Sequence, residues 1–87
     1  GVYFMDEKSK VLAKAVGEYL FSLRNEQRIS QEEMAARLQI TTRGLRKIEK
    51  GEVDASFYLL RSIVLELGGD MELFIHKVEK NVKIMTE

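Results

Sequence analysis

Residues 29–51 constrain the fold of this 87-residue chain more than any other stretch, because they read as two short helices joined by a tight turn. Ser30 can cap the first helix with its side-chain oxygen, and Glu33, three residues later, completes a capping box. The second helix runs to Lys50 and is ended by Gly51, a residue favoured just beyond a helix terminus. The pattern therefore predicts a closely connected pair of helices with defined starts and ends.

The second of these helices has two different faces. Leu45 and Ile48 are apolar and are expected to pack back on the first helix, while Thr41 or Thr42 caps the start. The opposite face carries four cations spaced i, i+3, i+4 and i+7, with only Glu49 against them. These cations are Arg43, Arg46, Lys47 and Lys50. A helix face of this kind suits an anionic partner.

Charge is distributed unevenly, although the formal net charge is zero. Residues 24–51 hold seven basic and four acidic residues, whereas residues 52–75 hold one basic and five acidic residues. The basic excess therefore coincides with the helix pair, which favours nucleic acid as the partner of that segment.

Composition narrows the class of protein. The chain is 45% hydrophobic and has no proline, which indicates a globular and mostly helical domain, and it has no cysteine, which excludes disulfides and thiolate metal sites. No apolar run approaches the roughly 18 residues of a membrane span, and no signal-peptide pattern is present. We expect a soluble, cytoplasmic protein that does not interact with a membrane. Whether residues 1–4, before Met5, are native is left open.

The segment SQEEMAARLQITTRGLRKIEKGE resembles the phage repressor/Cro-type helix-turn-helix family, also called the xenobiotic-response-element type. The resemblance covers roughly residues 20–67. It implies an all-α fold, a lambda-repressor-like bundle of four helices that contains the helix-turn-helix. We expect residues 1–69 to form this DNA-binding domain and residues 70–87 to form a C-terminal extension.

The resemblance also implies roles for individual residues. Positions that commonly touch DNA bases in the family are occupied here by Thr42, Arg43 and Lys47. Phosphate contacts are expected from Gln31, Arg46 and Lys50. A structural ion pair that would pin the first helix of the domain to the third is expected between Arg24 and Glu49.

Two residues depart from the family pattern. Gln39 stands in the turn where the family usually has glycine, so a left-handed backbone there would be strained. Gly44 lies inside the second helix of the pair, where glycine is unfavourable relative to alanine. Because glycine has no side chain, it could avoid a clash either with the preceding helix or with the DNA backbone, and the sequence leaves both possibilities open.

Helices are also expected on either side of the pair. One spans residues 6–25. Another begins at Ser56, which is expected to be its N-cap, and runs to Leu67, where a double glycine follows. The inward face of the latter is predicted to comprise Phe57, Leu60, Ile63, Val64 and Leu67. Its other faces also carry apolar residues, namely Tyr58, Leu59 and Leu65. A helix that is apolar nearly all round is usually covered on more than one side, which favours a second subunit.

The tail, residues 70–87, fits two patterns. As a strand, its apolar residues alternate between two faces from Met71 to Val78; as a helix capped by Asp70, they form one stripe that continues to Val82. The double glycine and the β-forming residues Phe74 and Ile75 favour the strand. Because a lone strand leaves backbone groups unpaired, we expect it to pair with the same strand of a second chain.

Together these observations predict a sequence-specific DNA-binding transcriptional regulator, a repressor, that acts on double-stranded DNA as a homodimer. The alternative is a protein-interaction module, such as an antitoxin that binds a toxin or other protein partner as well as DNA. A third possibility is a fold used only for dimerisation. No nucleophile–base pair, phosphate loop or metal-ligand spacing appears, so we expect no enzyme activity, no cofactor and no metal.

Overall fold

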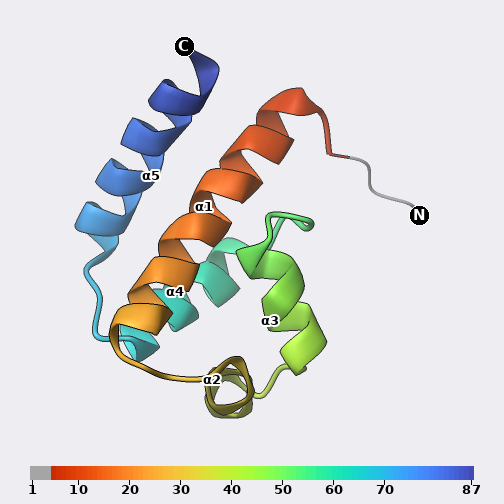
Figure 1. The fold of residues 1–87 in the computed structure, drawn as a ribbon, viewed down its shortest axis with the longest axis vertical. Helices are drawn as coiled ribbons and strands as arrows, with labels where there is room; N and C mark the ends of the chain where they lie inside the picture. The colour runs from red at the N-terminus through yellow and green to blue at the C-terminus, as the bar shows by residue number, and fades with distance from the viewer. Residues whose placement is uncertain (1–4) are drawn as a thin grey trace.

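A computed structural model describes residues 5–87, which form five α-helices (Figure 1). The helices are α1 (Glu7–Glu26), α2 (Gln31–Leu38), α3 (Thr42–Glu49), α4 (Phe57–Glu66) and α5 (Met71–Thr86). The expected all-α bundle is therefore present, with one helix more than predicted. The question of whether residues 1–4 are native lies outside the described residues.

Every helix begins with a side chain that accepts a hydrogen bond from the backbone N–H three residues later. The five capping residues are Asp6, Ser30, Thr41, Ser56 and Asp70. The predicted caps at Ser30 and Ser56 are confirmed, and Thr41 rather than Thr42 caps α3. The capping box is formed only in part, because the Glu33 carboxylate pairs with Arg37 at 2.7 Å on the surface of α2.

The predicted C-terminal strand is wrong, since the tail is the sixteen-residue helix α5. Its Asp70 cap accepts from the N–H of Leu73 at 2.9 Å, and Phe74 and Val78 are buried on its inner face. The Phe74 ring lies 5.3 Å from that of Tyr19 in α1, centroid to centroid. As a helix the segment satisfies its own backbone hydrogen bonds and lays one apolar stripe on α1, so it needs no second strand.

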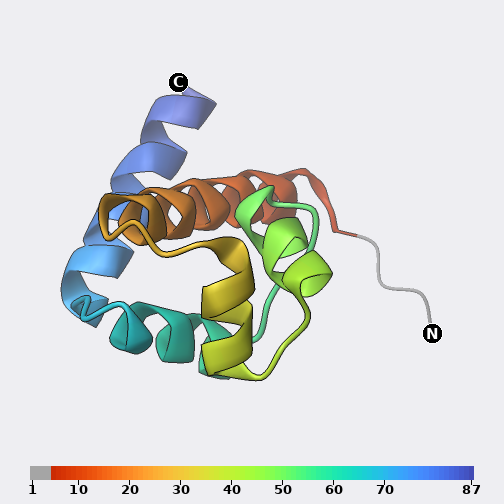
Figure 2. The ribbon, with the colours of Figure 1, turned by 60° about the horizontal axis from the view of Figure 1, so that its bottom comes forward.

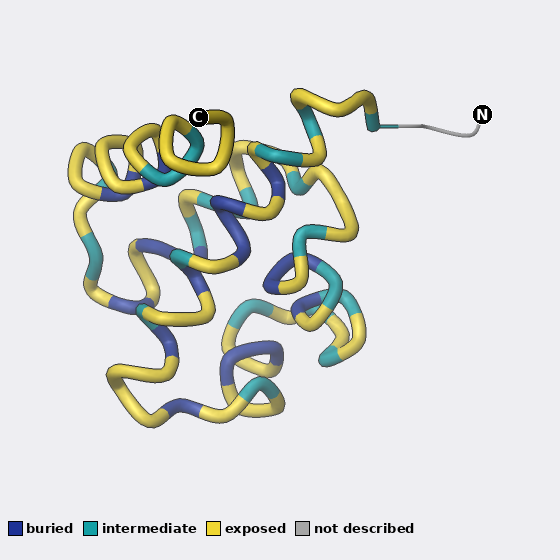
Figure 3. The backbone as a smooth tube through the Cα atoms, turned by 45° about the horizontal axis from the view of Figure 1, so that its top comes forward, coloured by how far each residue is buried: buried dark blue, intermediate teal, exposed yellow. Residues whose placement is uncertain are grey.

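Helix α1 is central in the arrangement. It lies between α5 on one side and α3 on the other, with α4 beneath it and α2 at one end of the bundle (Figures 1 and 2). The buried residues follow the inner faces of all five helices (Figure 3). The largest fully buried side chains are Leu20, Met34, Leu45, Ile63 and Val64.

The inward face predicted for α4 is partly wrong. Ile63, Val64 and Leu67 are buried as expected, but Phe57 is 65% exposed. Phe57 stands in the first turn of α4, where periodicity alone cannot tell whether a neighbouring element reaches far enough to cover a side chain. Tyr58 is 79% exposed, in agreement with its placement outside that face.

Candidate nucleic-acid interface

Helix α3 is held by one side and presents the other to solvent. Leu45 and Ile48 are buried in the core, as their spacing predicted. Arg43, Arg46 and Lys50 are exposed, and Thr42 and Lys47 at the edges of the same surface are half-buried. We call the surface formed by Arg43, Arg46, Lys47 and Lys50 the open side of α3.

The four cations of the open side have no partner within the part of the chain that the structure describes. Among residues 5–87, no ion pair and no side-chain hydrogen bond involves any of them. Some other basic residues are paired, since Arg37 pairs with Glu33 and Lys10 lies 3.7 Å from Glu7. The open side therefore keeps its positive charge available to an anionic partner.

The opposite, buried side of α3 ends in an ion pair with α1. Arg24 Nε donates to Glu49 Oε2 at 2.7 Å, and Arg24 Nη2 donates to Glu49 Oε1 at 2.9 Å. A third donor, Nη1, reaches the carbonyl oxygen of Ile29 at 2.7 Å. Both charged residues are buried, and the hydrogen bonds to Glu49 raise the pKa of the Arg24 guanidinium above its ordinary value. The structure thus brings Arg24 and Glu49 together as a two-pronged pair that fixes α3 against α1.

Gln31, at the start of α2, belongs to the same network. Its Nε2 donates to Glu49 Oε1 at 2.9 Å, so the side chain links α2 to the last residue of α3. This bond uses one of the two N–H groups of the amide and leaves the other for a further acceptor. Sequence patterns do not predict this bond, because residues 18 positions apart share no local signal.

A glycine permits the close contact between α1 and α3. A Cβ atom on Gly17 would lie 2.5 Å from the carbonyl oxygens of both Ile48 and Glu49. Such distances are far inside van der Waals contact, so any larger residue would push the two helices apart. Sequence reasoning missed this role, although a glycine in the middle of the helix expected at residues 6–25 was a possible signal.

The turn between α2 and α3 contains the strained residue that the sequence suggested. Gln39 has φ 58° and ψ 40°, a left-handed conformation, and its N–H bonds to the carbonyl oxygens of Ala35 and Ala36. The turn thus keeps the geometry for which glycine is the usual choice, at a cost of about 1 kcal/mol for a residue with a Cβ.

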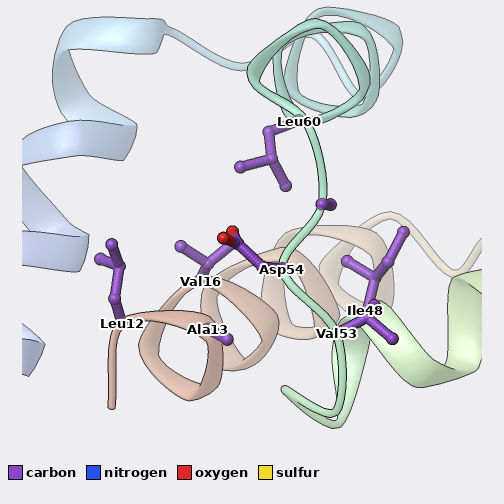
Figure 4. Close-up of a pocket in the computed structure, with 8 residues that line it drawn as sticks. Leu12, Ala13, Val16, Ile48, Val53, Asp54 and Leu60 are labelled. Carbon is purple, nitrogen blue, oxygen red and sulfur yellow. The ribbon is translucent and has the colours of Figure 1, made fainter. Parts of the chain in front are cut away.

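The described part of the chain offers little to a small ligand near α3. A cavity of about 50 Å³ lies between α1, α3, the loop after α3 and α4, and Figure 4 shows its mostly apolar walls. Such a volume accommodates one or two methyl groups. Within residues 5–87 no group of His, Cys, Asp and Glu side chains could hold a metal ion, and no helix has the length and apolarity required to cross a membrane.

The fold is similar to that of proteins whose structures have been solved. Two solved structures of the clp gene regulator ClgR from Corynebacterium glutamicum are similar in fold. One has a TM-score of 0.80 and 23% identity, over 86% of this chain and 80% of that chain. The other has a TM-score of 0.74 and 25% identity, over 79% of this chain and 90% of that chain. No curated protein sequence matches significantly.

The family comparison covers the region that the geometry singles out. A helix-turn-helix family model matches residues 20–74, which include α2, the turn and α3. This match spans well over half of the chain and agrees with the resemblance carried by residues 30–52. The chain belongs to the Cro/C1-type helix-turn-helix family.

Proposed function

We propose that this protein is a sequence-specific DNA-binding transcriptional regulator that inserts α3 into the major groove. The family and the fold support DNA binding and transcription regulation in general terms. The observation that carries the specific proposal is the open side of α3. Its four cations lack partners among residues 5–87, and the core and the Arg24–Glu49 pair hold the helix in place. A rigid helix with unpaired donors is what base recognition requires.

The residues of this surface divide into two groups. Arg43 and Lys47 can donate to the O6 and N7 atoms of guanine, and Thr42 can contact a base edge or a thymine methyl. Arg46 and Lys50 are assigned to phosphates, which fix the register of the protein without reading sequence. Gln31 can add a phosphate contact through its second amide N–H while the first holds Glu49.

The regulator is proposed to act as a homodimer and a repressor. Two copies would place their α3 helices in successive major grooves about 34 Å apart on a near-palindromic site. Because the tail is helical, the two chains do not pair through a C-terminal strand. Apolar side chains exposed on α4 and α5 offer the alternative surface, namely Phe57, Tyr58, Leu65, Leu73, Ile75 and Ile84. In the proposed dimer, part of this exposed apolar area would be covered by the second copy.

The decisive experiment selects bound sequences from a library of random duplexes, alongside a mass measurement of the protein free and bound. Enrichment of a palindrome by a protein that binds as two copies would support the whole proposal. Enrichment of a single half-site by one copy would retain DNA recognition and reject the dimer. No enrichment over unselected DNA would reject the regulator.

A second candidate, a module that binds a protein partner, rests on the same exposed apolar residues of α4. Salt separates the two functions. Binding that neutralises several phosphates must weaken steeply as salt rises, because counterions are released, whereas an apolar protein interface depends little on salt. Binding of the selected duplex measured between 50 and about 200 mM salt should therefore fall by orders of magnitude if α3 grips DNA as proposed.

A further inference from the structure

Gly44 has no explanation within the folded chain. It lies in the first turn of α3, where its backbone φ is not positive, so its conformation is open to any residue. Glycine inside a helix is less favourable than alanine, because it loses more backbone freedom on folding. A glycine at this position therefore requires a reason that the local conformation does not supply.

Packing does not supply the reason either. A Cβ atom on Gly44 would lie 3.0 Å from Oγ1 of Thr41 and, apart from its chain neighbours and the backbone of α3, no other described atom would lie within 4 Å. In particular it would not approach α2, which removes one of the two possibilities left by the sequence. Gly17 makes the contrast, since its Cβ would meet two backbone carbonyl oxygens of α3 at 2.5 Å.

The remaining contact, with the Thr41 cap, is tolerated elsewhere in the same molecule. The N–H of Gly44 donates to Thr41 Oγ1 at 2.9 Å. The other four helices make the same bond, with cap distances of 2.8 to 3.1 Å, to residues that all carry a side chain. Those residues are Ser9, Glu33, Leu59 and Leu73. A Cβ atom at this helix position is therefore compatible with the cap.

The position of Gly44 on α3 indicates what occupies the space. At 100° per residue it falls between Lys47 of the open side and the buried Ile48, along one edge of the surface proposed to enter DNA. We propose that Gly44 is the point of closest approach between α3 and DNA, where bare backbone admits the sugar-phosphate wall of the major groove. This inference rests on the proposed function. It makes Gly44 a positioning residue that sets how deeply Arg43 and Lys47 reach.

The test is the Gly44→Ala variant, measured for thermal unfolding and for binding to the selected duplex. We expect its melting temperature to rise by a few degrees, because alanine favours the helix, while its affinity for DNA falls at least tenfold. Gly44→Gln, whose longer side chain must lie against the same wall, should bind more weakly still. Ser22→Ala, at an exposed site in α1 and next to α5, is the matched control and should raise the melting temperature without changing affinity.

The outcomes separate this inference from the function on which it rests. If the wild type binds the duplex and Gly44→Ala binds equally well or better, the close approach is wrong while DNA binding stands. If Gly44→Ala unfolds at a lower temperature than the wild type, glycine serves the fold and the inference is overturned. If the wild type enriches no DNA sequence, both proposals fall together.

Discussion

An arginine and a glycine lie at each side of α3, but they have different roles on the buried side and on the open side. On the buried side, Arg24 meets Glu49 and Gly17 lets two helix backbones touch. On the open side, Arg43 has no acidic partner among the described residues, and at its edge a Cβ on Gly44 would meet the Thr41 cap but no other helix. Arg24 and Gly17 thus serve the fold, whereas Arg43 and Gly44 have no comparable role in packing or pairing within the described chain. We infer that residues of α3 without a structural role mark the surface that binds the partner.

The difference also predicts which measurement each substitution will affect. Changes on the buried side should lower the free energy of unfolding, and DNA binding should suffer only as a consequence. Changes on the open side should not destabilise the fold and should alter binding directly. A residue that violated this division would weaken the assignment of α3 as the recognition helix.

The largest effect is expected from Arg24→Met. Removing the guanidinium strands the buried Glu49 carboxylate with Gln31 as its remaining partner, which should cost about 3 to 5 kcal/mol in the free energy of unfolding. Urea unfolding followed by circular dichroism measures this loss. A loss below about 1 kcal/mol would show that the pair does not hold α3, because that is the range of solvent-exposed pairs.

A double variant identifies the cause of that loss. Arg24→Met combined with Glu49→Leu removes both charges, and apolar replacement of a whole buried pair is often close to neutral. The double variant should therefore recover much of the stability lost by Arg24→Met alone. Equal destabilisation of the two variants would assign the loss to packing instead of the stranded charge.

Gly17→Ala should be the next most damaging change. Its added methyl group must displace the carbonyl oxygens of Ile48 and Glu49, both part of the α3 backbone, and overpacking of this kind costs about 3 kcal/mol. The melting temperature should fall accordingly. If Gly17→Ala were as stable as the wild type, the contrast between the two helical glycines would disappear, and with it the argument for Gly44.

Sequence reasoning located the open side correctly, because caps and 3.6-residue spacing are local signals. Ser30, Thr41 and the buried Leu45 and Ile48 follow from such signals. The pairing of Arg24 with Glu49 came from family resemblance, and no local rule connects positions 25 residues apart. A glycine inside the predicted helix 6–25 is a weak signal for the fit of Gly17 against α3, because that fit depends on how closely two helices approach.

The failure at α5 has a different physical origin. Phe74 and Ile75 favour a strand by propensity, and short apolar runs fit either period. The choice between strand and helix is decided by an apolar face of α1 that would otherwise be exposed. Phe74 and Val78 are buried against this face when the tail is helical. Tertiary contact of this kind overrides propensity, and only the assembled fold reveals it.

On the open side, Arg43→Ala should cost about 2 kcal/mol in binding the selected duplex and relax specificity at one base pair. Its free energy of unfolding should stay within about 0.5 kcal/mol of the wild type, because Arg43 is exposed and pairs with no other residue that the structure describes. Arg61→Ala, an exposed arginine on α4, is the matched control and should alter neither quantity. Equal losses on selected and scrambled DNA would move Arg43 to the phosphate group of contacts.

Gln39→Gly tests the turn that joins the two helices. Glycine adopts the observed left-handed conformation without the Cβ penalty, so the variant should be about 1 kcal/mol more stable. Gln39→Ala keeps the penalty and should differ little from the wild type. Binding to DNA should not change, because neither substitution touches the open side. A loss of stability in Gln39→Gly would mean that the glutamine side chain stabilises the turn.

The smallest effect concerns the edge of the buried side, where packing is incomplete. The cavity of about 50 Å³ is bounded by Ala55 from the loop and by Ile48 from α3. Ala55→Val would place two methyl groups towards this space and should add about 0.5 kcal/mol to the free energy of unfolding. Ala55→Ser, which adds a polar atom instead, should not. If valine destabilised the protein, the cavity would be too small or too rigid for the two methyl groups. Packing at the edge of the buried side would then be as tight as the contact of Gly17 with α3.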